Sequence, residues 1–276
     1  MGATPEKSAY IVTGTTRGIG LALAQGVVAR GDLLYTISRA PEHRAPGNQN
    51  YCCDLRDLAQ VQAVMNRIMQ DIPYASCSDL VLINNAGMLA PIGFLENIAA
   101  AQMEAHLHVN VMAPSLLMSE FIHLSNQLAK SATQSADHLA DRLPCRRRIL
   151  NITSGAASTP YAGWSVYCAG KAALNMITRC AALEQSEGPG GVSISAIAPG
   201  VVDTDMQAQI RASNEADFPA RSRFVQMRAE GRMPTSAQVA ALILDLDGDG
   251  QFRNGGIYDL RDAVNCDGKP YIEKRQ

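Results

Sequence analysis

A tyrosine and a lysine stand four residues apart in the stretch SVYCAGKAA, which runs from 165 to 173. Residues at i and i+4 of a helix lie on one face, about 5–6 Å apart at Cβ. Tyr167 and Lys171 would therefore lie side by side. A free tyrosine has a pKa of about 10, and a neighbouring cation favours the phenolate, so the pair could exchange a proton with a bound oxygen near neutral pH. The same spacing also occurs by chance in ordinary helices, so other motifs have to decide.

A glycine-rich turn follows the first apolar run of the chain. The sequence TGTTRGIG places Gly14, Gly18 and Gly20 between a strand expected at 9–14 and a helix expected at 18–30. A strand, a tight turn and a helix start form the phosphate site of dinucleotide-binding folds, because backbone N–H groups and the positive end of the helix face the anion. The turn therefore predicts a bound pyrophosphate.

The end of the second strand bears on which dinucleotide is bound. Folds that bind NAD usually carry an acidic residue here, which accepts hydrogen bonds from the adenine ribose. This chain has Ser38 and Arg39 instead, and Arg17 supplies a second cation from the glycine turn. Guanidinium groups bind a phosphate in bidentate fashion, whereas a carboxylate would repel it. Although Arg39 could also be a solvated loop residue, the two arginines favour NADP(H).

Two further strand ends are expected to face the adenine half of the cofactor. Asp54, after the third strand, suits a contact with the adenine amino group, and it could equally cap the helix that follows. The NNAG segment at 84–87 ends the fourth strand with small residues and amides, where the adenine-side ribose would lie.

Short apolar runs alternate with helical patterns along the whole chain. Strands are expected at 9–14, 33–38, 50–54, 79–85, 148–153, 192–198 and 256–260, and helices at 18–30, 57–70, 99–129, 164–186 and 235–246. Several strands are apolar on both faces, which is typical of parallel strands covered by helices on each side. The alternation predicts an α/β fold, a single-domain Rossmann-type doubly wound sheet of about seven parallel strands with helices on both faces. The one domain spans 1–276, with a polar surface insertion after the long helix, at 125–148.

Composition excludes several other classes of protein. The net charge of −2 and the pI of about 6.2 give no reason to expect nucleic acid or an anionic membrane as partner. Seven scattered cysteines without Cys-x-x-Cys spacing, and a start without a signal-peptide pattern, predict a cytoplasmic protein with reduced thiols. The run 146–148, three arginines, is expected to be a solvated loop entering a strand.

No metal site is expected. The sequence DLDGDG at 245–250 imitates a calcium loop, but position 12 of such a loop would be Gly256 rather than a glutamate, so a turn before the last strand is the better interpretation. His106 and His108 have no third partner at ligand spacing, and they are expected to serve helix packing.

Taken together, the motifs resemble one known family. TGTTRGIG, NNAG, NITSGAAS, YCAGK and APGVVDT, in this order and spacing, are similar to those of the short-chain dehydrogenase/reductase family, over about residues 8 to 260. Within it, SGAASTPYAGWSVYCAGKAALNM and APGVVDTDMQAQIR look most like the sepiapterin reductases and their bacterial benzil reductase relatives.

The resemblance implies catalytic roles for four residues. Tyr167 would be the acid that protonates a carbonyl oxygen as hydride arrives from the nicotinamide, and Lys171 would lower its pKa and hold the nicotinamide ribose. Ser154, which precedes Tyr167 by the family's 13 positions (167 − 154), would stabilise the substrate oxygen. Asn110 would interrupt the long helix and anchor a water that links Lys171 to solvent.

The resemblance also implies a set of cofactor contacts. Val202 would meet the carboxamide, and Thr204 would lie beside the cofactor. The full set expected to bind NADP(H) is Gly14, Arg17, Gly18, Ile19, Gly20, Ser38, Arg39, Asp54, Leu55, Asn84, Asn85, Ala86, Gly87, Tyr167, Lys171, Pro199, Gly200, Val202 and Thr204.

The substrate side is expected to be aromatic and apolar. Tyr161 and Trp164 lie between Ser154 and Tyr167, and the segment 204–232 is expected to form a mobile lid, although an ordinary helical excursion packed on the core fits it nearly as well. Trp164 could equally be a core anchor. Further expected substrate contacts are Met206 and, through a weak likeness to the pterin-anchoring acid of sepiapterin reductases, Asp262.

The resulting hypothesis is an NADPH-dependent carbonyl reductase of small dicarbonyls or aromatic ketones. A reductase of carrier-bound 3-oxoacyl groups is an alternative, because Arg211, Arg221, Arg223 and Arg228 could form a basic docking surface. A non-catalytic NADP(H) sensor is another, although all four catalytic positions are present. The resemblance implies a homodimer or homotetramer built on the helices around 101–129 and 164–186.

Overall fold

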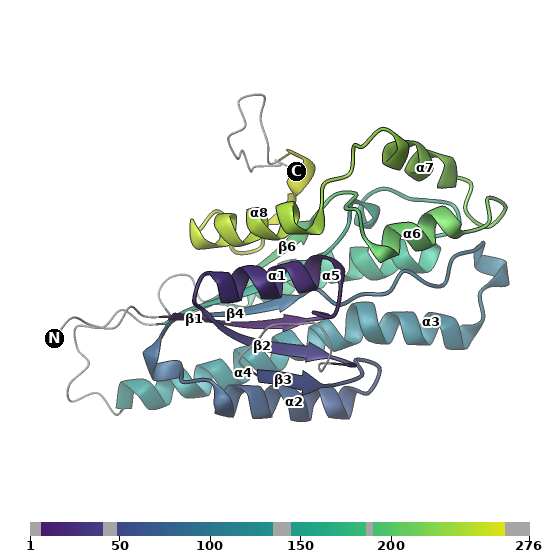
Figure 1. Ribbon diagram of the computed structural model, residues 1–276. Helices are drawn as coiled ribbons and strands as arrows, with labels where there is room; N and C mark the ends of the chain where they lie inside the picture. Colours follow the sequence, from purple (N-terminus) through teal and green to yellow (C-terminus); the bar gives the residue numbers. More distant parts are fainter. Residues whose placement is uncertain (1–6, 41–48, 135–144, 186–189, 263–276) are drawn as a thin grey trace.

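The computed structural model describes residues 7–40, 49–134, 145–185 and 190–262, arranged around one seven-stranded sheet (Figure 1). The strands are β1 (Lys7–Thr13), β2 (Leu33–Ser38), β3 (Gln49–Cys52), β4 (Cys77–Asn84), β5 (Arg146–Ile152), β6 (Val192–Ala198) and β7 (Ile257–Asp259). Their order is β3-β2-β1-β4-β5-β6-β7, and every neighbouring pair is parallel. The predicted doubly wound sheet is confirmed, and its direction of winding reverses between β1 and β4.

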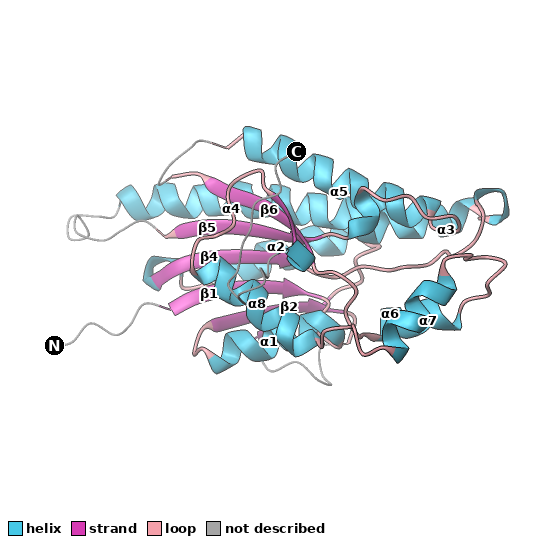
Figure 2. Cartoon of the chain, turned by 90° about the horizontal axis from the view of Figure 1, so that it is seen from above, coloured by secondary structure: helices cyan, strands magenta, loops and turns pink. Residues whose placement is uncertain are grey.

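Helices cover both faces of the sheet (Figures 1 and 2). α1 (Gly18–Ala29) and α8 (Ser236–Gly248) pack on one face, while α2 (Leu58–Asp71), α4 (Ala113–Gln134) and α5 (Ser165–Leu183) pack on the other. α3 (Ala100–Leu107) leads into α4. Two short helices, α6 (Asp205–Ala212) and α7 (Arg221–Ala229), extend beyond the sheet on the side where the strands end.

Alternate side chains of a strand point to opposite faces of the sheet, and so contribute to two separate hydrophobic cores. Ile11 of β1 belongs to the core under α2, α4 and α5, while its neighbours Tyr10 and Val12 belong to the core under α1 and α8. All three are at most 3% exposed. A strand buried on both faces needs apolar residues at every position, which explains the uninterrupted apolar run at the start of the chain.

The long helix expected at 99–129 is broken at the predicted place. The segment His108–Met112 forms a π-helix between α3 and α4, and Asn110 lies within it. π-Helical turns widen the backbone and re-aim side chains, and they are frequent at functional sites. The break therefore changes the direction of the Asn110 side chain from the one it would have in a regular α-helix.

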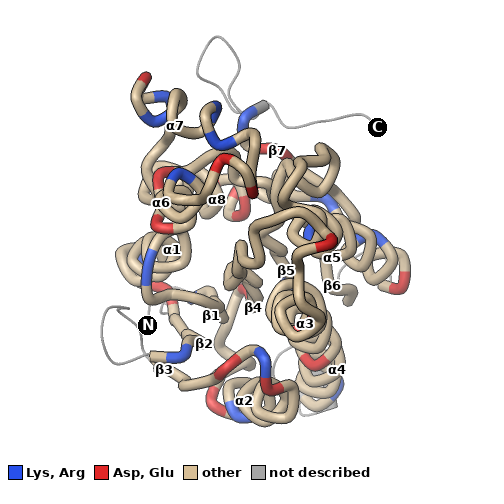
Figure 3. Tube along the Cα trace, turned by 90° about the vertical axis from the view of Figure 1, so that its right-hand side faces the viewer, with Lys and Arg blue, Asp and Glu red and all other residues tan. Residues whose placement is uncertain are grey.

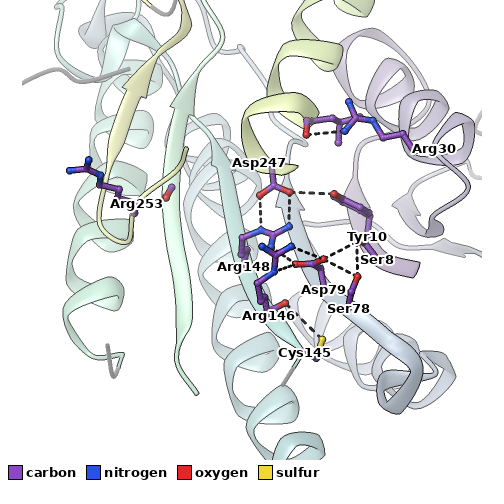
Figure 4. Close-up of polar contacts among 12 residues, drawn as sticks. Ser8, Tyr10, Arg30, Ser78, Asp79, Cys145, Arg146, Arg148, Asp247 and Arg253 are labelled. Carbon is purple, nitrogen blue, oxygen red and sulfur yellow. Dashed lines mark hydrogen bonds and ion pairs between the residues drawn. The ribbon is translucent and has the colours of Figure 1, made fainter. Parts of the chain in front are cut away.

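The expectation of a solvated loop at 146–148 is wrong. All three arginines lie inside β5, and Arg147 is 5% exposed. Arg148 bridges two buried carboxylates, with its Nε 2.7 Å from Asp247 Oδ1 and its Nη1 bonded to Asp79 (Figure 4). Local composition suggested solvent, but acids from β4 and α8 supply the buried partners that charged groups require.

The expected turn at 245–250 is also partly wrong. α8 continues to Gly248, so Asp245 and Asp247 are helical, and the turn is confined to the residues after the helix. Asp247 is 1% exposed and accepts a hydrogen bond from the Tyr10 hydroxyl at 3.3 Å, in addition to its pair with Arg148. The acidic cluster of the sequence thus includes a carboxylate that ties α8 to the sheet rather than a set of calcium ligands.

Candidate active site

The candidate site lies where the strands end, as Figure 3 shows from that side. In doubly wound sheets, ligands bind at the carboxyl ends of the strands, at the point where the strand order reverses. The glycine turn follows β1, the NNAG segment follows β4, Ser154 follows β5, and the Pro-Gly turn at 199–200 follows β6. The fold therefore brings all the predicted motifs to one edge.

Three of the four predicted catalytic residues meet between β5 and α5. Tyr167 is 6% exposed, and the Ser154 side chain is near enough to its hydroxyl to lower the pKa of the phenol. Lys171 is 5% exposed, and its Nζ donates to the Ile152 carbonyl at 2.8 Å, at the end of β5. Ser154 begins the 3-10 turn η4 (Gly155–Ala157), where its Oγ accepts from the Ala156 N–H at 3.2 Å. The helical spacing of Tyr167 and Lys171, and the position of Ser154 after β5, thus bring the three side chains together.

Burial sets the proton affinities of this group. Removal from water raises the pKa of the Tyr167 hydroxyl, and the Ser154 side chain opposes that rise. Burial lowers the pKa of Lys171 to about 8. Tyr167 therefore holds its proton in the protein alone, which is the form required of an acid that protonates a carbonyl oxygen.

Asn110 is brought close to these residues by the π-helix. Its amide accepts from the Met88 N–H at 3.0 Å and donates to the Met88 carbonyl at 2.7 Å. A side chain on Gly87 would place its Cβ 3.0 Å from Asn110 Oδ1 and 3.6 Å from Lys171 Nζ. The Asn110 oxygen and the Lys171 ammonium group therefore both lie close to the backbone at Gly87, because glycine has no side chain to occupy that space.

His106 is a functional neighbour that the sequence analysis assigned to packing alone. It is fully buried, its Nδ1 lies 2.8 Å from the Ala90 carbonyl, and its Nε2 lies 2.7 Å from Asn110 Nδ2. Its ring also meets the Tyr167 ring edge-on at 6.0 Å. Burial, assisted by the Lys171 charge, lowers the pKa of His106, so it is a neutral imidazole. Its place four residues before Asn110 was the only signal in the sequence.

The glycine turn fits a dinucleotide. Gly14 has φ +72°, and a Cβ there would lie 2.9 Å from the Ala86 Cα. A Cβ on Gly20 would lie 2.1 Å from the Gly14 carbonyl oxygen, so helix α1 can start this close only without one. Asn85 ties the turn to β4 by donating to the Thr13 and Gly14 carbonyls. The Thr15 hydroxyl beside the turn is buried without a hydrogen-bond partner, as expected of a group that awaits a ligand.

The end of β2 has the features expected for an adenosine phosphate. The Ser38 hydroxyl is buried and has no hydrogen-bond partner, while Arg39 is exposed beside it. Arg17 is the N-terminal cap residue of α1, and its guanidinium lies 3.4 Å from Asp205 of α6 in an exposed pair. Such a pair contributes only about 0–1 kcal/mol, so a phosphate can compete for Arg17.

The other predicted cofactor residues either bind polar side chains of the protein or pack in its hydrophobic cores. Asp54 binds Arg56 through its carboxylate, which lowers the pKa of Asp54 to about 2. The helix-cap alternative for Asp54 is wrong, because Asp57 caps α2. Asn84 is turned inward and donates to Asn151 at 2.9 Å, which joins β4 to β5. Leu55 is buried in the core under α2, α4 and α5, and Ile19, in the first turn of α1, packs against the core on the other face of the sheet.

Thr204 occupies the position expected of a residue beside the cofactor. It caps α6, and its methyl group lies 3.5 Å from where a Cβ of Gly18 would be. Val202 is 3% exposed, behind the Pro-Gly turn. The segment that follows β6 therefore returns to the glycine turn after β1.

An aromatic cluster covers Tyr167 from the side of α6 and α7. Trp164 stacks on Phe218 at 4.3 Å and meets the Tyr167 ring at 5.5 Å, while Tyr161 lies 5.2 Å from Trp164. Trp164 is 4% exposed and Phe218 is fully buried, so of the two alternatives for Trp164 the structure favours the core anchor. Met206 packs against the same cluster. The side chain of Asp262 lies outside the described residues.

The comparisons agree with this geometry. The family model described as short chain dehydrogenase matches residues 8–215. The benzil reductase ((S)-benzoin forming) of Bacillus cereus is 33% identical over 90% of this chain and 96% of its own length, and the sepiapterin reductase of Xenopus laevis is 28% identical over 91% and 95%. A crystal structure of a short chain dehydrogenase from Burkholderia cenocepacia in complex with NADP has a TM-score of 0.66 and 26% identity, over 92% of this chain and 96% of that one.

The chain belongs to the short-chain dehydrogenase family. It is an oxidoreductase of carbonyl and alcohol groups that uses a nicotinamide cofactor. Its relatives in sequence include benzil and sepiapterin reductases. Within the described part of the chain, no three His, Cys, Asp or Glu side chains cluster as metal ligands, and no helix there is long and apolar enough to cross a membrane.

Proposed function

We propose that this chain reduces a small dicarbonyl or aromatic ketone, with NADPH as the reductant and Tyr167 as the proton donor. The observation that carries the proposal is the position of Tyr167, whose ring meets Trp164 beneath the stacked Trp164–Phe218 pair and whose pKa, raised by burial, is lowered in part by the nearby Ser154 side chain. It places a protonated phenol against an apolar, aromatic wall. A flat, uncharged carbonyl compound suits that combination.

The reaction requires one thing from the cofactor, a hydride delivered to the carbonyl carbon. The chain does the rest. Ser154 and Tyr167 hold the carbonyl oxygen, and Tyr167 passes its proton to that oxygen as negative charge develops there. The Lys171 ammonium group favours the phenolate that remains, and Asn110, beside Gly87, is placed to hold a water that returns a proton by way of Lys171.

NADPH is favoured over NADH by charge. Arg39 follows β2 directly, Arg17 lies in the glycine turn after the neighbouring strand β1, and the buried Ser38 hydroxyl lacks a partner. Asp54, after the neighbouring strand β3, has its carboxylate bound to Arg56. These features support a 2′-phosphate contact.

The arginines of α6 and α7 argue against an acyl-carrier partner. Arg211 and Arg228 both pair with Asp203, and Arg221 lies 3.9 Å from Glu215. Arg223 donates to the Tyr161 hydroxyl at 3.3 Å. Asp203 and Glu215 offset about half of the charge of these four arginines, which weakens the attraction of this surface for an acidic carrier protein. The segment 204–232, which buries Phe218 and Phe224, is proposed to open for substrate as a lid.

We also infer that copies of the chain associate through α4 and α5. A hollow of about 520 Å³ lies between these helices on their outer side, lined by residues such as Met118, Ile122, Met176 and Ile177. Met176 is 58% exposed, so this face leaves an apolar side chain uncovered beside the hollow. Light scattering of the purified chain, with Met176→Glu as the disrupting variant, tests this directly.

Substrate class is tested with a panel of purified compounds and NADPH. Benzil-like diketones, pterin ketones, hydroxysteroids, sugars and a carrier-bound 3-oxoacyl thioester are compared by kcat/KM. We expect the diketones or pterin ketones to be reduced best. Activity confined to steroids, sugars or the thioester would refute the substrate assignment, and no NADPH-dependent turnover of any carbonyl would refute the function itself.

A further inference from the structure

Arg261, from near the far end of the chain, lies beside Gly155, the residue that follows Ser154. It follows β7 in the 3-10 turn η5 (Leu260–Asp262). A Cβ added to Gly155 would lie 3.0 Å from its Nη2, and a Cβ added to Gly200 would lie 3.0 Å from its Cγ. The arginine stem therefore lies along the Pro-Gly turn after β6, and the guanidinium tip lies against the residue that follows Ser154.

Asp259 orients this guanidinium. The Nε of Arg261 lies 2.9 Å from Asp259 Oδ1, and its Nη2 bonds the other carboxylate oxygen. The backbone N–H of Arg261 donates to the same carboxylate at 3.0 Å. A two-point contact of this kind fixes the plane of the guanidinium. The Nη end, rather than the stem, consequently lies nearest to Gly155 and Ser154.

We propose that Arg261 determines specificity by binding a second substrate oxygen, so that the chain prefers vicinal dicarbonyls to matched monoketones. The inference rests on the proposed function, in which Ser154 and Tyr167 hold the reacting oxygen. In a 1,2-dicarbonyl the second oxygen is carried by the carbon next to the reacting one. The Arg261 guanidinium lies beside the residue that follows Ser154, where it can donate a hydrogen bond to that second oxygen. Asp259 offsets much of the positive charge, which favours a neutral carbonyl oxygen over a carboxylate.

The contact would also assist the chemistry. A charge-assisted hydrogen bond to the second carbonyl draws electron density away from the neighbouring carbon, which then accepts hydride more readily. Hydride adds to the reacting carbon, and Tyr167 supplies the proton to its oxygen. One carbonyl becomes a secondary alcohol, while the carbonyl bound by Arg261 is unchanged, so the product is a hydroxyketone.

The experiment compares benzil with deoxybenzoin, in which a methylene group replaces the second carbonyl. We expect Arg261→Gln to lower kcat/KM for benzil by about 10- to 100-fold, the range for losing a hydrogen bond to a charged group, and to change kcat/KM for deoxybenzoin by less than about 3-fold. Arg261→Lys, which keeps the charge, should retain part of the preference. Arg179→Gln serves as the matched control, because Arg179 is exposed on α5 about 18 Å along the helix from Tyr167.

A second variant tests the placement without touching the arginine. A Cβ at Gly155 would lie 3.0 Å from Nη2, so Gly155→Ala should push the guanidinium away by a few tenths of an ångström and produce a smaller loss of the same kind, selective for benzil. An equal loss on both substrates in Arg261→Gln, or no loss on either, overturns the inference while the reductase function stands. A wild-type chain that reduces neither compound with NADPH overturns the proposed function and this inference together.

Discussion

Asn110 Nδ2 donates a hydrogen bond to His106 Nε2 at 2.7 Å, across one turn of a helix that becomes a π-helix between them. The Ala90 carbonyl, 2.8 Å from His106 Nδ1, can only accept, so Nδ1 carries the proton and Nε2 is free to accept. The imidazole therefore fixes which way the Asn110 amide faces. This relationship makes His106 a positioning residue for the Asn110 amide near Lys171.

We expect His106→Leu to leave the buried Asn110 N–H without its partner. The free energy of unfolding should fall by about 1–3 kcal/mol, the cost of an unsatisfied buried donor. Urea unfolding followed by fluorescence measures it. If His106 served only to fill space, leucine would be tolerated with little change.

Tyr167→Phe removes the hydroxyl without changing the ring. Turnover should fall by at least about 100-fold, since general acid catalysis contributes about 10²–10⁴. NADPH affinity, measured by fluorescence titration, should stay within a few-fold of wild type. Near-normal turnover in this variant would show that another group supplies the proton.

Arg39→Asp should distinguish the two nicotinamide cofactors. It places a carboxylate where the proposed 2′-phosphate lies, so NADPH should bind about 10- to 100-fold more weakly while NADH changes little. Arg253→Asp, in the connection before β7 at the opposite edge of the sheet from β2, is the control for a general charge effect. Equal weakening of both cofactors by Arg39→Asp would place Arg39 elsewhere.

Lys171→Met should stabilise the protein in a pH-dependent way. The pKa of Lys171 is about 8 in the fold against 10.5 for the free side chain, so below pH 8 folding buries a charge at a cost of about 3 kcal/mol. That cost disappears as the pH rises from about 8 to above 10.5, where the lysine is neutral in both states. The stability difference between variant and wild type should therefore be largest below pH 8 and shrink through this window. A difference independent of pH from 7 to 10.5 would contradict the lowered pKa.

Asp247→Asn tests the buried ion pair of β5 and α8 (Figure 4). Arg148 would lose one of its two carboxylates in a nearly dry site, and breaking such a pair costs about 3–5 kcal/mol. Arg146→Gln is the comparison from the same arginine run, since the Arg146 side chain is 62% exposed and its buried partner Asp79 would keep its pair with Arg148, so the loss should be smaller. Thermal unfolding of the two variants should rank them clearly, and equal midpoints would argue that solvent reaches Arg148.

Much of the architecture could be predicted because it depends on local patterns. The strand–helix alternation, the glycine turn before α1, and the i, i+4 pair of Tyr167 and Lys171 are each set by periodicity or by backbone geometry within a few residues. The interruption of the long helix at Asn110 was also expected, through a family resemblance, and the structure confirms it as a π-helix. Each of these features depends on residues that are close together in the chain, so the sequence alone is enough to predict it.

The tertiary structure decided everything that depends on partners distant in the chain. Arg148 looked solvated because its acids, Asp79 and Asp247, are 69 and 99 residues away. The sequence could not place Arg261 near Ser154, because that arrangement depends on the pairing of β7 with β6. It could not assign Trp164 to the core, because that depends on the stacking of Phe218 on its ring. Which side chains a charge or an aromatic ring meets inside the protein depends on how the sheet and helices pack, and no short stretch of sequence contains that information.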